Sequence, residues 1–345
     1  MDWITFRDTI IFAPHFNDKL NNEMVSKYKR IIFSNYELDY DLFESYSCEN
    51  YDNYDYYLDH LDCCFSEFNQ QINNLHSSVK ELILGYSFNK KVNNLPQGLT
   101  HLTFTGEFNQ KVNNLPQGLT HLTFTGEFNQ KVNNLPESLM DLTFGYDFNQ
   151  KVDNLPQDLE YLTFGYNFNQ EVDNLPQDLE YLTFGYNFNQ EVNMLPQGLT
   201  RLILSYKFDR PINNLPSELI YLGLGIGFNQ KITLTPNITH LQLNCNNQYL
   251  LDNLTNCIKR LELYVDFNLE LNNLPTSIRE IVFDKDSEYN IELNCLPNFV
   301  EFLQLPFSYD KKILRLPEKL NQIVCSENYK YLDDFIKYNV KYHKN

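Results

Sequence analysis

The chain repeats itself every 20 residues, and this period constrains the fold more than any other feature. Residues 88–107 and 108–127 differ at one position, as do residues 148–167 and 168–187. A fixed period in this range is typical of stacked repeat proteins, in which each repeat packs against its neighbours. The repeats open at the phenylalanines Phe68, Phe88, Phe108, Phe128, Phe148, Phe168, Phe188, Phe208 and Phe228.

One repeat contains the pattern of a short half-buried strand. Counting the opening Phe as position 1, apolar residues fall at positions 1, 5, 8, 12, 15 and 17. Leu122 and Phe124 flank Thr123, and this alternation predicts a strand at the end of the repeat. Pro116 at position 9 cannot donate a strand hydrogen bond, so it favours a turn. The sequence predicts a repeat solenoid that is leucine-rich-repeat-like, with one short parallel β-strand in each coil of about 20 residues.

The motif F-N-x-x-[VI]-x-N-L-P-x-x-L-x-x-L-x-[FL] resembles the FNIP repeat family, over residues 68 to about 328. That family is similar to leucine-rich repeats and is known from social amoebae and giant viruses of amoebae. The resemblance implies a binding solenoid and brings no catalytic residues. In viral members the repeats often follow an F-box, which implies an alternative function as a substrate-recognition adaptor for a ubiquitin ligase. No clear F-box is seen in this sequence.

We expect three regions along the chain. Residues 1–67 form degenerate amino-terminal repeats with an acidic, tyrosine-rich insertion, residues 68–328 form the solenoid, and residues 329–345 form a cap. The insertion is a solvated loop, a Tyr/Asp patch that docks a basic partner, or a cation site at its aspartates. In the cap, Leu332, Phe335 and Ile336 have helical spacing, which predicts a short helix over the last coil.

Composition and charge exclude several classes of partner. The net charge of −18 argues against nucleic acid and anionic membranes and favours a basic protein partner. The same charge favours a monomer. The seven cysteines follow no metal spacing, and we find neither a leader peptide nor an apolar run long enough for a membrane. We expect a cytoplasmic protein, in the host cytoplasm if the chain is viral.

Residues at positions 14, 16 and 19 are expected to form columns along the strand side of the solenoid. Tyrosines there would offer rigid contact area, although stacking of good strand formers also explains such columns. His101 and His121, one strand apart at position 14, could share a metal ion or a proton. Asparagines at positions 2 and 7 would form hydrogen-bonded ladders between coils. The candidate partner-binding residues are His101, His121, Asp141, Tyr146, Tyr161, Tyr166, Tyr181, Tyr186, Arg201, Tyr206 and Tyr221.

Nothing in the repeats resembles a catalytic constellation. We recognise no Ser/His/Asp set, paired catalytic carboxylates or phosphate-binding glycine loop. Near-identical repeats also do not provide the unique arrangement that an active site needs. The sequence therefore predicts a non-enzymatic protein-interaction scaffold with no cofactor and no metal.

Overall fold

The computed structural model describes residues 2–34, 65–73 and 75–342, in two compact units that divide after Phe168. Most of the predicted acidic insertion lies outside the described residues. The predicted boundaries at residues 67 and 328 remain a proposal. We describe the amino-terminal unit, residues 1–168, and the carboxy-terminal unit, residues 169–345, separately.

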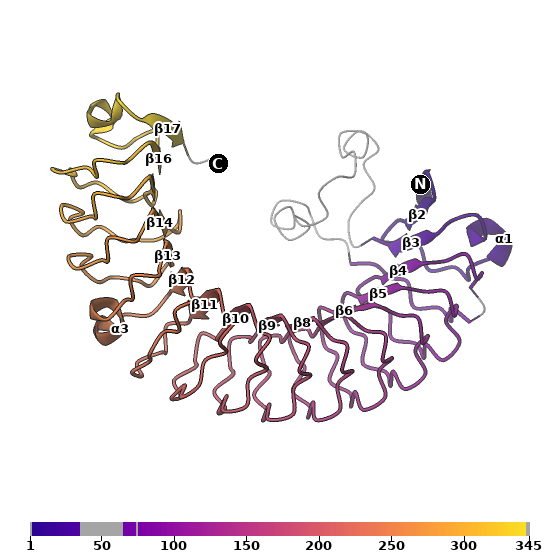
Figure 1. Ribbon diagram of the computed structural model, residues 1–345. Helices are drawn as coiled ribbons and strands as arrows, with labels where there is room; N and C mark the ends of the chain where they lie inside the picture. Colours follow the sequence, from indigo (N-terminus) through magenta and orange to yellow (C-terminus); the bar gives the residue numbers. More distant parts are fainter. Residues whose placement is uncertain (1, 35–64, 74, 343–345) are drawn as a thin grey trace. The chain divides into compact units, whose positions relative to one another are not determined.

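The amino-terminal unit has one strand in each coil (Figure 1). Strand β1 pairs with β2 in antiparallel orientation, and β2 through β8 pair in parallel, each with the next. The elements are β1 (Trp3–Phe6), β2 (Thr9–Phe12), α1 (Asn22–Val25), β3 (Arg30–Phe33), β4 (Glu81–Leu84), β5 (His101–Phe104), β6 (His121–Phe124), β7 (Asp141–Thr143) and β8 (Tyr161–Thr163).

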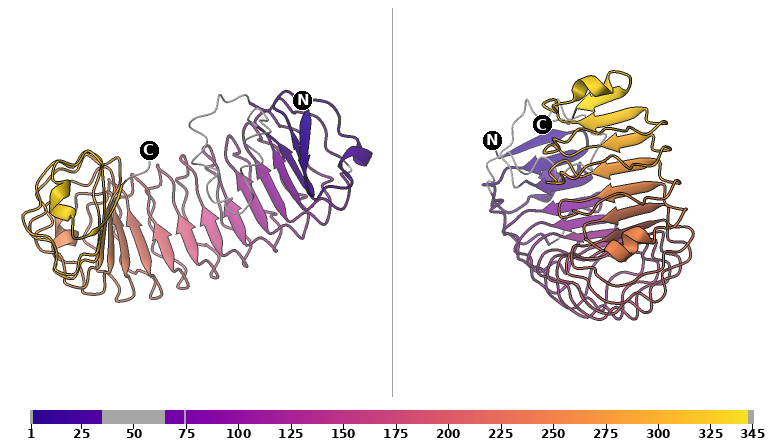
Figure 2. Two further views of the ribbon diagram at one scale, coloured as in Figure 1. Left: turned by 90° about the horizontal axis from the view of Figure 1, so that it is seen from above. Right: turned by 90° about the vertical axis from the view of Figure 1, so that its left-hand side faces the viewer.

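The carboxy-terminal unit continues the same pattern with parallel strands β9 to β17. Figure 2 shows these strands side by side. The elements are β9 (Tyr181–Thr183), β10 (Arg201–Ile203), β11 (Tyr221–Leu224), β12 (His240–Leu243), α3 (Gln248–Asp252), β13 (Arg260–Leu263), β14 (Glu280–Phe283), β15 (Phe302–Gln304), β16 (Gln322–Cys325), η2 (Leu332–Phe335) and β17 (Asn339–Tyr342). The prediction of a solenoid with one short parallel strand per coil is confirmed.

A row of stacked phenylalanine rings runs through the interior, and successive coils each contribute one ring at position 1. Phe88, Phe108 and Phe128 are at most 1% exposed, and successive ring centroids lie 6.1 Å apart. The side chain at position 17 packs beside the ring at position 1 of the next repeat: the ring centroids of Phe124 and Phe128 lie 3.8 Å apart. Offset stacking of this kind adds specific geometry to the burial of a large apolar surface. The predicted interior rows are therefore confirmed.

A ladder of asparagines at position 2 joins neighbouring coils. The backbone N–H of Asn129 donates to Oδ1 of Asn109 at 3.1 Å, and the N–H of Asn149 donates to Oδ1 of Asn129 at 3.0 Å. This part of the ladder prediction is confirmed. It is wrong for position 7, because Asn114 and Asn134 are exposed and, within the described residues, form no side-chain hydrogen bond to another coil.

Glycine is required where the chain turns after a strand, because adjacent coils approach closely there. A Cβ atom on Gly165 would lie 2.0 Å from the carbonyl oxygen of Gly145, and one on Gly126 would lie 2.1 Å from that of Gly106. No such contact exists at Gly118, where the nearest atom is 3.5 Å away. The corner glycines therefore set the spacing that aligns the side chains of successive coils.

The ends of the array depart from the repeat. The antiparallel strand β1 was not predicted, and its Trp3 packs on Phe12 with ring centroids 6.3 Å apart. The predicted carboxy-terminal helix is the short 3-10 helix η2, in which Phe335 is 1% exposed. Strand β17 then extends the sheet in parallel to β16. Ile336, in the link between η2 and β17, is 79% exposed.

Candidate functional site

Position 14 forms a continuous column in the amino-terminal unit. Strand pairing places His101 opposite His121, His121 opposite Asp141, and Asp141 opposite Tyr161. Directly opposed residues in neighbouring strands share one face of a sheet, within reach of each other. The threonines at position 16 are aligned in the same way, from Thr103 to Thr163. We call the side chains at positions 14 and 16 the strand face.

The two histidines are stacked and held in place. Their ring centroids lie 4.1 Å apart with an interplanar angle of 13°. Nδ1 of His101 lies 2.9 Å from Oγ1 of Thr100, and Nδ1 of His121 lies 2.9 Å from Oγ1 of Thr120. Burial and then the charge of His121 lower the pKa of His101, so the stack favours neutral His101.

Charged groups lie at both ends of this stack. Burial raises the pKa of Asp141, and the neighbouring His121 opposes that shift. On the other side, Arg30 forms an ion pair with Glu81, with Nε to Oε2 at 2.6 Å and Nη2 to Oε1 at 2.9 Å. The histidine stack therefore lies between the Arg30–Glu81 ion pair, whose charges cancel, and the half-buried carboxyl group of Asp141.

The carboxy-terminal unit carries its own column at position 14. Tyr181 lies opposite Arg201, which lies opposite Tyr221. The guanidinium carbon of Arg201 is 3.6 Å from the ring centroid of Tyr221, a close cation–π contact. Because Tyr221 is only 9% exposed, it offers little contact area of its own, whereas Tyr181 is 37% exposed.

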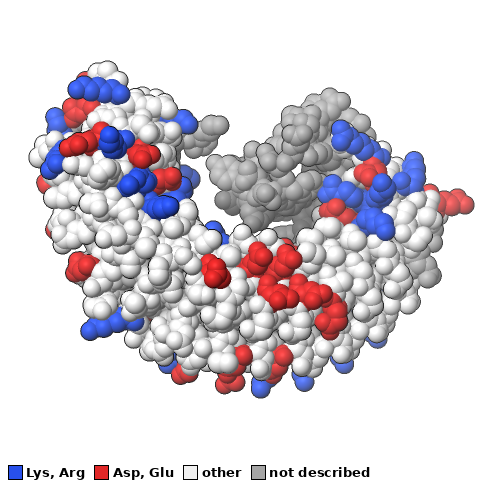
Figure 3. Space-filling model, in the orientation of Figure 1, with Lys and Arg blue, Asp and Glu red and all other residues white. Residues whose placement is uncertain are grey.

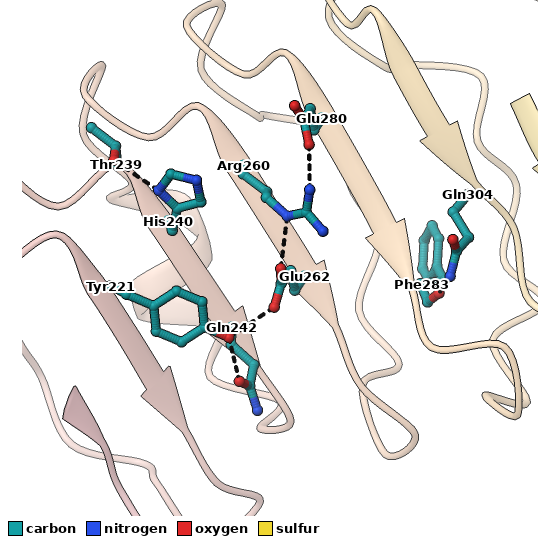
Figure 4. A network of polar contacts seen from close by, with 9 residues as sticks. All are labelled: Tyr221, Thr239, His240, Gln242, Arg260, Glu262, Glu280, Phe283 and Gln304. Carbon is teal, nitrogen blue, oxygen red and sulfur yellow. Dashed lines mark hydrogen bonds and ion pairs between the residues drawn. The ribbon is translucent and has the colours of Figure 1, made fainter. Parts of the chain in front are cut away.

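Tyr221 belongs to a polar network that extends over three further strands (Figure 4). Its hydroxyl shares one proton between Oε1 of Gln242 at 2.5 Å and Oε2 of Glu262 at 2.8 Å. Arg260 donates from Nε to Oε1 of Glu262 at 2.7 Å and from Nη1 to Oε2 of Glu280 at 2.5 Å. The network is a chain of charge-assisted hydrogen bonds across the strand face.

The environment of this network shifts the pKa values of its members. Burial and the hydrogen bond to Glu262 raise the pKa of Tyr221 well above its usual range. For Arg260, burial acts to lower the pKa, but hydrogen bonds and charges of Glu262 and Glu280 raise it. Both groups are protonated at neutral pH even without these shifts, which show how strongly the network favours Tyr221 as a donor and Arg260 as a cation.

Sequence reasoning missed Gln242, Arg260, Glu262 and Glu280. The repeat that opens at Phe228 is one residue short, so a count of 20 from Tyr221 ends at Leu241, which is an interior residue. Following the apolar pattern instead of the count would have found the continued column.

Tyrosines at position 19 are stacked in pairs at the corner after the strand. In the amino-terminal unit, the ring centroids of Tyr146 and Tyr166 lie 4.6 Å apart with an interplanar angle of 8°. In the carboxy-terminal unit, Tyr186 and Tyr206 are 4.5 Å apart at 12°. Tyr146 is 54% exposed. We call the residues at positions 19 and 20 the corner row.

In the described residues, no three or more His, Cys, Asp or Glu side chains are grouped so as to hold a metal ion. No helix in the same residues is both long and apolar enough for a membrane span. Burial raises the pKa of the Cys245 and Cys325 thiols to about 11, which disfavours the reactive thiolate.

Among solved structures, the chain is similar to CroV588, described as a circular leucine-rich-repeat protein and found in a giant virus. The TM-score is 0.74 at 32% sequence identity, over 95% of this chain and 48% of CroV588, so the chain spans about half of that protein's length. YopM from Yersinia enterocolitica WA-314 is similar at 20% identity with a TM-score of 0.43, over 75% of this chain and 68% of YopM. Comparison with curated proteins finds no match.

The family comparison agrees with the repeat that organises the fold. The sequence matches the FNIP repeat in overlapping segments at residues 68–106, 88–126, 108–147, 128–167, 148–187, 168–193 and 186–226. These segments include strands β4 to β11, with the stacked rings and the asparagine ladder described above. Residues 68–226 are therefore FNIP repeats.

Proposed function

We propose that this chain is a non-enzymatic scaffold that binds a protein partner through the strand face and the corner row. The observation that carries the proposal is the exposure of aligned aromatic side chains. Tyr146, Tyr161 and Tyr166 are 54%, 39% and 37% exposed in the amino-terminal unit. Tyrosine provides large, rigid contact area with a polar tip, and such residues are enriched among those that dominate binding energy.

The polar residues of the same surface suit partner selection. The histidine stack, Asp141 and the network around Glu262 offer fixed donors and acceptors between the aromatic rings. Preorganised groups lose little conformational freedom when a partner binds. Leucine-rich-repeat-like solenoids are also a common scaffold for protein binding, and the net charge of −18 favours a basic partner.

The rest of the proposal follows from these features. We place the protein as a monomer in the cytoplasm, and in the host cytoplasm if the chain is viral, as the giant-virus origin of CroV588 suggests. The alternative role as a ubiquitin-ligase adaptor remains a prediction. Residues 2–34 form β1, β2, α1 and β3, and no observation on them favours that role.

The test is quantitative affinity capture from an amoebal cell extract with three forms of the full chain. The first is the unaltered protein, the second carries Tyr146→Ala and Tyr166→Ala, and the third carries Tyr249→Ala and Tyr342→Ala. Tyr249 and Tyr342 are 44% and 51% exposed but lie on α3 and β17, which makes them a matched control. Partners should be recovered by the first and third forms and lost by the second. Equal recovery by all three would remove this surface from the proposal.

A further inference from the structure

A polar hollow lies beside the corner row of the amino-terminal unit. Its volume is about 450 Å³, and Figure 3 shows red carboxylate side chains gathered over the region of β6 to β8. Every lining residue is a carboxylate or a carboxamide, so the hollow is rich in hydrogen-bond acceptors. The lining residues are Asn109, Glu127, Asn129, Asp147, Asn149 and Asn167.

The two carboxylates of the hollow have no cationic partner among the described residues. Asp147 accepts a hydrogen bond from Nδ2 of Asn167 at 2.9 Å, and neither Asp147 nor Glu127 forms an ion pair there. Both occupy position 20 of successive coils, where their backbone N–H groups bond to the preceding coil. Two like charges fixed on adjacent coils repel each other, and a cation placed between them would relieve that repulsion.

An exposed aromatic pair belongs to the same corner row as these carboxylates. Tyr146 directly precedes Asp147 in the chain and stacks on Tyr166. A ring face beside a carboxylate attracts a planar cation twice, through the ring quadrupole and through charge-assisted hydrogen bonds. The hollow thus has the chemistry of a site for a cationic side chain.

In the carboxy-terminal unit, one of the chain's own cations contacts the equivalent corner tyrosine. Nζ of Lys207 lies 5.1 Å from the ring centroid of Tyr186 and donates to Oδ1 of Asn187 at 2.9 Å. Lys207 and Asn187 occupy position 20, and Tyr186 occupies position 19, like Tyr146. Beside Tyr146 the counterpart of Asn187 is the carboxylate Asp147, and the counterpart of Lys207 is the neutral Asn167, whose Nδ2 donates to Asp147 at 2.9 Å, so the acceptor is charged there and the cation is missing.

We infer that the hollow beside Tyr146 binds an arginine side chain from an extended segment of the partner protein. The guanidinium would lie on the Tyr146 ring and donate to the carboxylates of Asp147 and Glu127. Arginine suits this site better than lysine because its planar fork stacks on rings and binds carboxylates in a bidentate manner. Arg201 on Tyr221 shows this stacking within the chain itself. The inference rests on the proposed function and names the partner's contacting residue.

A library of random 12-residue peptides displayed on phage is the probe. Binders are selected on the full chain and then measured as synthetic peptides on four forms of it. The forms are the unaltered chain, the Glu127→Gln and Asp147→Asn variant, the Tyr146→Ala and Tyr166→Ala variant, and a control with Glu171→Gln and Asp173→Asn. The control removes the same charge from exposed residues at positions 4 and 6. Each peptide is also made with citrulline or lysine in place of its arginine.

We expect the selected peptides to share an arginine, and their affinity to fall roughly tenfold on the hollow variant and again with citrulline. The control should bind unchanged. The citrulline peptide tests the same contact without any change to the protein. Peptides that need Tyr146 and Tyr166 but no arginine would overturn the inference and leave the proposed function standing. Equal binding by the lysine peptide would overturn the choice of arginine. Binders indifferent to both tyrosines would remove the corner row and the hollow together.

Discussion

The asparagine ladder allows a matched test of what holds the coils together. Oδ1 of Asn129 accepts from the backbone N–H of Asn149 at 3.0 Å and from Nε2 of Gln150 at 3.0 Å. Asn129→Ala removes this acceptor and with it both hydrogen bonds. Asn134 in the same repeat is exposed and, within the described residues, bonds to no other coil, so Asn134→Ala is the control.

The size of the effect follows from the groups left without a partner. A buried donor that loses its acceptor costs about 1–3 kcal/mol, whereas the Gln150 amide can turn to water and lose less. We expect Asn129→Ala to lower the free energy of unfolding by roughly 2 kcal/mol. An exposed substitution such as Asn134→Ala should change it by less than about 0.5 kcal/mol.

Two measurements check this expectation. Urea unfolding reports the whole array, but repeat proteins need not unfold in a single step. Amide hydrogen exchange at Asn149 therefore reports the local bond, and 2 kcal/mol corresponds to roughly 30-fold faster exchange. Equal unfolding curves for the two variants, together with unchanged exchange at Asn149, would refute the idea that the asparagine hydrogen bonds stabilise the stacked coils.

Three further predictions follow from the geometry. Gly165→Ala should destabilise the chain by about 1–3 kcal/mol in urea unfolding, because its Cβ would meet a carbonyl oxygen at 2.0 Å, while Gly118→Ala should be tolerated. The lowered pKa of His101 means that the unfolded chain binds more protons than the folded one. Stability should therefore fall as the pH drops below about 6.5, and His101→Gln should reduce that dependence in unfolding curves measured across the range. Tyr221→Phe should cost about 1 kcal/mol in thermal unfolding, because Glu262 and Gln242 lose their shared donor; an unchanged melting temperature would contradict the network.

The interior of the coils was predictable because each interior position is copied many times. Leu122 and Phe124 occupy equivalent places in neighbouring repeats, so one conformation satisfies the whole array. The ends were not predictable in the same way. Leu332, Phe335 and Ile336 have helical spacing, but the helix formed is one short turn, and the following residues pair with the β16 edge instead. The hydrogen bonds offered by that edge outweigh the weak local preference for a longer helix.

The candidate site was predictable only where repeats keep their length. Strand pairing, rather than residue count, decides which side chains face each other, and His240 lies opposite Tyr221 although the repeat is short. The apolar residues Leu222 and Leu241 fix this register, because a slip of one residue would turn them to the outside. The network around Glu262 depends on that register, and the predicted column at position 14 ended at Tyr221, before the rest of the network.

Duplication of a coil explains why the aromatic side chains of this surface occur as stacked pairs. Adjacent parallel strands lie about 4.8 Å apart, which is close to the stacking distance of flat rings. Copying one coil that carries an exposed ring therefore produces a stack without any further change, as at His101 and His121 or at Tyr146 and Tyr166, where the rings lie 4.1 and 4.6 Å apart. Each ring limits the motion of its copy, so a flat, rigid surface arises together with the added length. Position 14 nevertheless changes from His to Asp to Tyr along the array while the interior positions stay the same. The interior contacts do not depend on that change, and recognition of a partner, as proposed above, would account for these differences.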